Sequence, residues 1–256
     1  MASSVSVRAG REPAGNTATT WLKIIALVFM FIDHAGKMLF PTVPELRLIG
    51  RIAFPIYAWC MVVGFHYTSS VPRYLLRVLA VGLLSQPLYM KALNHPWNDP
   101  NIFLTLFLGL CALWGIREKK FLSQIWAPAI AIALATVLEA DYNWRGVVLF
   151  IMLYAVQDSR PGIAAVMVAY FLFWGSMYSV TRSLFGMPVD LNTLPNWLSK
   201  PLTCLMRNET YALLGLPLIL VRFKKDLKIP RWVGYVLYPA HLALLYVLEL
   251  IMQKGV

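Results

Sequence analysis

Long apolar runs recur along the whole chain and are separated by short polar stretches. Runs of roughly 15 to 20 residues predict helices that cross a lipid bilayer, because an ideal span takes ~20 residues. We expect about nine spans, and the shorter runs allow eight to ten. Their approximate ranges are 22–40, 49–67, 74–90, 102–116, 121–138, 146–157, 162–180, 208–221 and 232–250.

The pattern therefore predicts an all-α polytopic integral membrane protein. Residues 1–20 are small and polar, and we expect them to form a flexible tail. Residues 21–256 contain no internal repeat and no low-complexity tract, so they are expected to form a single helical bundle.

Composition supports the membrane prediction. The chain is 59% hydrophobic and 14% charged, with a mean hydropathy of +0.63, whereas a soluble domain carries nearer ~25% charged residues. A net charge of +11 could indicate nucleic acid in a soluble chain, but here the basic residues lie between the apolar runs. We expect a lipid bilayer and no nucleic acid as partners. The three cysteines lack metal-ligand spacing, so no metal site is predicted.

The distribution of basic residues predicts the orientation. With nine spans and a cytoplasmic N-terminus, 14 of the 23 Lys and Arg residues fall on the cytoplasmic side, dominated by the segments "REKK" and "RFKKDLKIPR". The positive-inside rule favours this arrangement. We expect a multi-pass protein of the bacterial inner membrane with its N-terminus in the cytoplasm.

Three ionisable residues, Asp33, His34 and Lys37, stand at the end of the first apolar run. Ionisable groups at membrane depth are costly and indicate functional sites by default. Asp33 and Lys37 are i, i+4 neighbours that could form an ion pair. The alternative interpretation is structural: Lys37 reaches the interface, Asp33 pairs with it, and His34 only satisfies a neighbouring helix.

Two arginines, Arg47 and Arg51, open the second run and are also i, i+4 neighbours. Pro55 follows them and is expected to kink the helix or to leave a carbonyl group free. Arg47 lies near the predicted membrane boundary, so its side chain could either snorkel to the interface or belong to a functional site. Arg51 lies deeper and is long enough to reach Asp33 or an anionic ligand.

Other polar residues are weaker candidates. Tyr238 and His241 stand at i, i+3 on one face of the last predicted span. Those proposed to position a substrate are Asn101, Asp141, Tyr142 and His241, although such residues are more often helix caps or interfacial residues. His66 and His95 fall at a span end and in a loop, and we expect both to be solvated.

Four segments in order resemble the TraX family of membrane proteins: "LKIIALVFMFIDHAGKMLFP", "LRLIGRIAFPIYAW", "NIFLTLFLGL" and "YPAHL". The resemblance covers nearly the whole chain after the tail. That family is associated with conjugative transfer and with acetylation of the pilin N-terminus. More distantly, the pair Lys23 and His34 is similar to an Arg-then-His pattern in the first helix of membrane-bound acyltransferases, with Lys in place of Arg.

The resemblance implies acyl transfer from cytoplasmic acetyl-CoA, the expected acyl donor, to a pilin-like membrane polypeptide. In this interpretation Lys23 and Arg47 bind the coenzyme, whose phosphates suit cations. His34 is the general base, because imidazole is well matched to an amino terminus. Arg51 stabilises the oxyanion, and Asp33 holds Arg51 or Lys37 in place.

Two alternatives remain open at this stage. The same chemistry could acetylate a hydroxyl group of a surface polysaccharide or lipid. The chain could also be a transporter or scaffold without enzymatic activity, although transporters often contain internal repeats.

Overall fold

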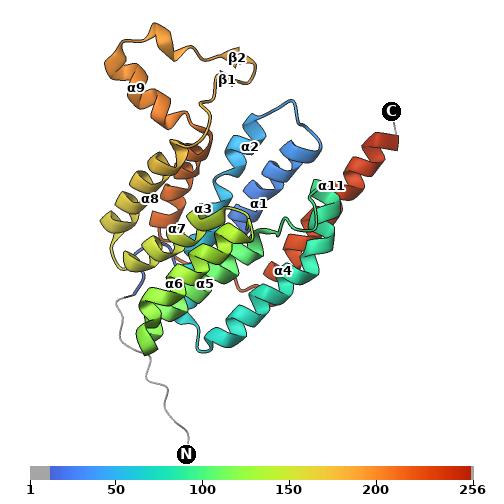
Figure 1. The fold of residues 1–256 in the computed structure, drawn as a ribbon. Helices are drawn as coiled ribbons and strands as arrows, with labels where there is room; N and C mark the ends of the chain where they lie inside the picture. The colour runs from blue at the N-terminus through green and yellow to red at the C-terminus, as the bar shows by residue number, and fades with distance from the viewer. Residues whose placement is uncertain (1–11, 255–256) are drawn as a thin grey trace, which may run out of the picture.

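Helices make up most of residues 12–254, the part of the chain that the computed structural model describes (Figure 1). The α-helices are α1 (Thr19–Met38), α2 (Glu45–Gly50), α3 (Ala53–Tyr67), α4 (Val71–Leu93), α5 (Ile102–Glu118), α6 (Ser123–Val137), α7 (Asn143–Ala155), α8 (Arg160–Gly175), α9 (Asn196–Leu205), α10 (Leu216–Leu220) and α11 (Arg231–Lys254). The shorter elements are the 3-10 helices η1 (Lys120–Leu122), η2 (Leu191–Thr193) and η3 (Asn208–Gly215) and the strands β1 (Ser183–Leu184) and β2 (Met187–Pro188).

Several of these helices fit a membrane protein. Among the described residues, four segments are long and apolar enough to cross a bilayer: Thr19–Met38, Glu45–Tyr67, Lys120–Val137 and Trp232–Gln253. Asn143–Ala155 and Arg160–Gly175 are apolar but shorter. The helical fold expected from the sequence is confirmed, and the count of nine spans stays a prediction.

Helix α3 lies at the centre of the bundle. It packs against α1, α5, α7, η3 and α10. Its side chains are buried on nearly every face, including Phe54, Trp59 and Phe65, as expected for a helix that is apolar all round. Helix α1 runs antiparallel to it, since the Sγ atom of Cys60 lies 3.8 Å from the carbonyl oxygen of Thr19 and Gly50 lies beside Asp33.

A bend at Arg51 and Ile52 separates α2 from α3. Pro55 explains it, because proline has no amide hydrogen to donate to the carbonyl group of Arg51 four residues earlier. The sequence predicted a kink or a free carbonyl at this point, and the structure has the helix break there. The bend brings α2 against α1 and η3.

The predicted flexible tail is shorter than residues 1–20. Asn16 is fully buried. Its backbone carbonyl oxygen accepts a hydrogen bond from Trp59 Nε1 at 2.7 Å, and its backbone amide donates to the carbonyl oxygen of Ile219 at 2.6 Å. Helix α1 begins at Thr19. Residues 12–18 are therefore part of the packed bundle, and residues 1–11 lie outside the described residues.

An arm between α8 and η3 projects from one end of the bundle and contains β1, β2 and α9 (Figure 1). The strands pair Ser183 with Pro188 and Leu184 with Met187. A hydrogen bond of 2.5 Å from the amide group of Phe185 to the Glu45 carboxylate ties the arm to α2. No membrane span was predicted between residues 180 and 208.

Gly50 allows α1 and α2 to approach each other closely. A Cβ atom at Gly50 would lie 2.8 Å from the Cα atom of Asp33, which is backbone and cannot move aside. We expect Gly50→Ala to destabilise the protein by about 1–3 kcal/mol, as overpacking of a filled interior does. Thermal unfolding of the detergent-purified protein measures this.

The matched control is Gly234→Ala in α11, where an added Cβ atom meets nothing within 4 Å. It should be neutral or slightly stabilising, since alanine favours a helix over glycine by up to about 1 kcal/mol. Equal melting temperatures for Gly50→Ala and Gly234→Ala would contradict the close approach of α1 and α2.

Candidate active site

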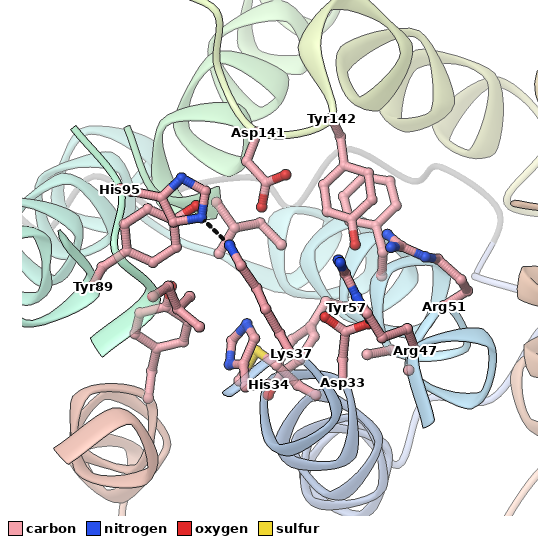
Figure 2. Close-up of a pocket in the computed structure, with 17 residues that line it drawn as sticks. Asp33, His34, Lys37, Arg47, Arg51, Tyr57, Tyr89, His95, Asp141 and Tyr142 are labelled. Carbon is pink, nitrogen blue, oxygen red and sulfur yellow. Dashed lines mark hydrogen bonds and ion pairs between the residues drawn. The ribbon is translucent and has the colours of Figure 1, made fainter. Parts of the chain in front are cut away.

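A polar cavity of about 140 Å³ lies between α1 and the loop that precedes α7 (Figure 2). Its walls come from α1, α2, the α2–α3 bend, α3, α4, the loop after α4, α5, the loop before α7 and α11. The lining residues are Met30, Asp33, His34, Lys37, Arg47, Gly50, Arg51, Ala53, Phe54, Tyr57, Tyr89, Leu93, His95, Ile102, Asp141, Tyr142 and Tyr238. The cavity thus gathers ionisable groups from distant parts of the chain.

Helix α1 supplies three of these groups from its last turns: Asp33, His34 and Lys37. In Figure 2 the side chain of Lys37 extends across the cavity, while Asp33 lies on the side of the two arginines. The structure therefore brings His34, Asp33, Arg47, Arg51, Asp141 and Tyr142 together, as the functional interpretation of the sequence required.

His34 forms a pair with His241 of α11. Nδ1 of His34 lies 2.9 Å from Nε2 of His241, and Nδ1 of His241 lies 3.2 Å from the carbonyl oxygen of Leu237. A carbonyl oxygen only accepts, so Nδ1 of a neutral His241 carries the proton and its Nε2 is the acceptor. Nδ1 of His34 must then donate, which leaves Nε2 of neutral His34 unprotonated.

This pair matches the geometry that a general base requires. A second group fixes the tautomer of the base and leaves its other nitrogen to receive a proton. The two rings stack with centroids 5.1 Å apart, and Tyr238 packs edge-on against His241 at 5.3 Å. His241, which the sequence suggested for substrate positioning, contacts His34 and does not line the cavity.

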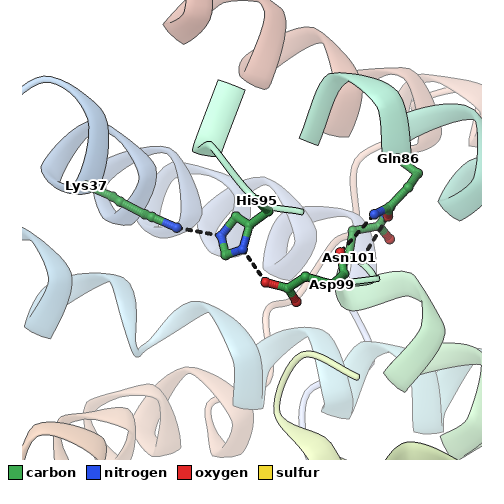
Figure 3. A network of polar contacts seen from close by, with 5 residues as sticks. All are labelled: Lys37, Gln86, His95, Asp99 and Asn101. Carbon is green, nitrogen blue, oxygen red and sulfur yellow. Dashed lines mark hydrogen bonds and ion pairs between the residues drawn. The ribbon is translucent and has the colours of Figure 1, made fainter. Parts of the chain in front are cut away.

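Lys37 contacts His95 rather than Asp33 (Figure 3). Its Nζ atom lies 2.5 Å from Nε2 of His95, and Nδ1 of His95 is bonded to the Asp99 carboxylate. An ammonium group only donates, so Nε2 of His95 accepts and its Nδ1 donates to Asp99. Lys37, His95 and Asp99 thus form a continuous hydrogen-bonded chain, and Lys37 and His95 line the cavity.

The expectation that His95 is a solvated loop residue was therefore wrong. His95 lines the cavity and stacks on Tyr89 at 4.8 Å. The sequence held one local indication that His95 has a partner. Asp99 stands four residues later, and the two side chains form an i, i+4 pair. His66 does not line the cavity.

The ion pairs of the two arginines differ from those expected. Arg51 pairs with Glu209 of η3 at 3.4 Å, and Glu209 is buried. Asp33 pairs with Arg47, with 3.8 Å between Arg47 Nε and Asp33 Oδ1. The predicted pairing of Asp33 with Arg51 or Lys37 was wrong, and the sequence analysis missed Glu209 entirely.

Asp141 and Tyr142 form the wall opposite α1 (Figure 2). Tyr142 has a positive φ of 64°, a strained conformation for a bulky residue that often accompanies functional sites. Its ring stacks on Phe54 with centroids 3.8 Å apart. The Thr105 hydroxyl donates to the backbone carbonyl of Asp141. These contacts hold the loop against the core.

Asn101 and Lys23 lie away from the cavity. Asn101 is a buried helix cap: its Oδ1 accepts from the amide group of Phe103, and its Nδ2 donates to Gly82 and Gln86. Lys23 lies near the other end of α1, about 16 Å from His34 at 1.5 Å per residue. Its carbonyl oxygen lies 3.5 Å from the hydroxyl group of Tyr57, which lines the cavity.

Burial raises the pKa of the Asp141 carboxyl from 3.8 to about 6, although Arg51 favours its charged form. A raised pKa means that the fold is relatively stabilised while Asp141 is protonated, and that this stability is lost as pH rises through 6. At ~1.4 kcal/mol per pH unit, ionisation above pH 6 costs up to about 3 kcal/mol.

We expect Asp141→Asn to be more stable than the wild type at pH 8, with the difference shrinking towards pH 4. Melting temperatures of both proteins across this range measure the effect. Glu139→Gln changes an exposed carboxylate of the same loop and should not show this trend. A constant difference between Asp141→Asn and the wild type at all pH values would contradict the raised pKa.

The fold and the cavity define the class: a helical membrane protein with a polar site enclosed between its helices. The chain belongs to the TraX protein family, whose sequence profile matches residues 18–249. This confirms the family resemblance seen in the sequence.

Two relatives show how similarity extends along the chain. A probable fimbrial assembly protein, FimC of serogroup H1 from Dichelobacter nodosus, is 26% identical over 253 residues, 91% of this chain and 96% of that protein. An uncharacterized protein of Rickettsia prowazekii (strain Madrid E), RP591, is 32% identical over 98 residues, so the similarity spans 37% of its length and 38% of this chain. No solved structure matches.

Proposed function

We propose that the protein is a membrane-bound acyltransferase that moves an acetyl group from acetyl-CoA to the N-terminal amine of a pilin-like polypeptide. The observation that carries this proposal is the His34–His241 pair, because it leaves an unprotonated ring nitrogen on a residue that lines a charged cavity. The fimbrial assembly relative, similar over nearly its whole length, supports a pilus subunit as the acceptor.

The size of the cavity suits the reacting groups. A cavity of about 140 Å³ is comparable to one of ~150 Å³ that holds a benzene molecule. It has room for an acetyl group and an amine but not for a nucleotide. The remainder of the coenzyme would therefore lie outside this cavity.

The ionisable side chains that line the cavity have separate roles in this reaction. Nε2 of His34 accepts a proton from the amine as its nitrogen forms the new bond to the acetyl carbon. The cations Arg51 and Lys37 stabilise the negative charge that develops on the carbonyl oxygen, an effect that is strong where water is excluded. The proton held by His34 then passes to the departing sulfur. Acetyl-CoA supplies the activated acyl group.

We place the N-terminus in the cytoplasm and the protein in the bacterial inner membrane, from the distribution of basic residues. Lys23 then lies at the cytoplasmic end of α1, where acetyl-CoA is available, and His34 lies ~16 Å further along the helix. Tyr57 lies between the two, because it lines the cavity and its hydroxyl group contacts the carbonyl oxygen of Lys23.

The test is acetyl transfer by purified protein in detergent. Release of free CoA and the mass of the product are followed with a pilin N-terminal peptide, with the same peptide blocked at its amine, with a sugar acceptor, and with no acceptor. The proposal expects release only with the free amine. Transfer to the sugar alone would mean that the acceptor is a sugar and not a pilin-like polypeptide. No transfer by folded protein would refute the acyltransferase proposal.

A further inference from the structure

A second cavity of about 290 Å³ adjoins the first and shares Arg47 and Arg51 with it. Its other walls come from α2, from the start of the projecting arm and from the first residue of η3. The lining residues are Pro44, Arg47, Leu48, Arg51, Thr181, Arg182, Ser183 and Asn208. The roles proposed above for the first cavity do not use this space.

Most of the polar groups that line the second cavity can donate hydrogen bonds. Oδ1 of Asn208 accepts from the Thr181 hydroxyl at 3.1 Å, so the amide nitrogen of Asn208 is left to donate. The guanidinium groups of Arg47, Arg51 and Arg182 can only donate hydrogen bonds. None of the residues that line this cavity is acidic. A site built from donors and guanidinium groups fits an anion.

The charge balance favours an anion with a single negative charge. Arg47 is paired with Asp33 and Arg51 with Glu209, so these two arginines are largely neutralised. Arg182 is exposed at the rim of the cavity and forms no ion pair within the described part of the chain. One uncompensated guanidinium matches one carboxylate, whereas the diphosphate of a nucleotide would bring at least two charges.

We infer that the second cavity binds the side-chain carboxylate of an acidic residue a few positions after the acceptor's N-terminus. This rests on the proposed function and adds to it the sequence that the enzyme selects. Because Arg47 and Arg51 line both cavities, an anchor bound in the second one holds an amine attached to it close to His34.

A polypeptide explains the surroundings of this site better than a lipid headgroup. One wall is the start of the β1–β2 hairpin, an exposed two-stranded sheet whose free edges can pair with an extended peptide.

The test uses two fluorescent peptides that differ only by Glu or Gln near a free N-terminus, with the acidic position varied over residues 3 to 6. Their binding to the full chain in phosphatidylcholine nanodiscs is measured without acetyl-CoA. We expect the best Glu peptide to bind about tenfold more tightly than its Gln partner, as loss of one close charge pair predicts. Arg182→Gln should bind the two equally.

The control is Arg145→Gln, which removes a cation that lines neither cavity and stacks on Trp144. It should keep the preference for Glu. Equal affinities in the wild type, or equal weakening of both peptides by Arg182→Gln, would overturn the inference. So would loss of the Glu preference in phosphatidylglycerol nanodiscs, because a lipid phosphate would then occupy the site.

Binding and transfer separate the two proposals. Selective binding of the Glu peptide without any acetyl transfer would refute the proposed function and leave the carboxylate site standing. Acetyl transfer that is indifferent to Glu and Gln, in KM as well as in kcat, would refute the carboxylate site and leave the function.

Discussion

Under the proposed function, replacing His34 by alanine is expected to lower acetyl transfer by about 10²- to 10⁴-fold, the usual contribution of a positioned general base. The expectation follows from the bond between Nδ1 of His34 and Nε2 of His241, which leaves Nε2 of His34 as a proton acceptor. CoA release at saturating peptide measures the loss in kcat.

His241→Ala should cause a smaller loss, because His34 then loses its orienting partner but keeps its ring. The double variant His34→Ala/His241→Ala should be no worse than His34→Ala, since residues that act as a unit are not additive. His66→Ala, which changes a histidine outside the cavity, is the control and should keep full activity. Full activity of folded His34→Ala would refute its role as the base.

Replacing Glu209 by glutamine is expected to destabilise the protein by about 3–5 kcal/mol, because it leaves the guanidinium group of Arg51 buried without its counter-ion. Arg51 and Glu209 are 3.4 Å apart, and their side chains are 20% and 6% exposed. The melting temperature in detergent measures the loss.

The surface pair between Lys120 and Glu118 is a matched control. It has the same separation of 3.4 Å but is 74% and 38% exposed, so Glu118→Gln should cost at most about 1 kcal/mol. Equal effects of the two substitutions would contradict the burial of the Arg51–Glu209 pair.

A double variant separates stability from chemistry at this pair. Arg51→Met/Glu209→Met replaces both charges by apolar side chains, which is often neutral for a buried pair. We expect its melting temperature to return towards that of the wild type while the proposed acetyl transfer stays impaired, because Arg51 lines the first cavity. Recovery of both stability and activity would remove Arg51 from the mechanism and leave it a structural role.

Local sequence pattern was sufficient to identify the groups that α1 contributes. Charged residues at the end of an apolar run are costly in a membrane, so Asp33, His34 and Lys37 were recognisable without a partner. Helical periodicity likewise placed Tyr238 and His241 on one face, and their rings are in contact. Proline chemistry predicted a break near Pro55, which the structure has at Arg51.

The partners of these groups were not readable from the sequence. Arg51 and Glu209 are 158 positions apart in the chain, and Lys37 and His95 are 58 apart. Periodicity reports which residues share a face of one helix, but it carries no information on which distant helix that face meets. Asp33 and Lys37 fit the i, i+4 rule, yet each bonds to a residue outside α1.

The one-dimensional pattern of apolar runs and isolated charges is enough to specify a helical membrane protein and to mark α1 as its unusual helix. That information is local, because burial of apolar surface and the cost of a charge in lipid act on each residue separately. The packing of α2, α4, α11 and η3 around α1 selects the partners of His34, Lys37, Asp33 and Arg51. It depends on side chains from distant segments that fit together only once the bundle has formed.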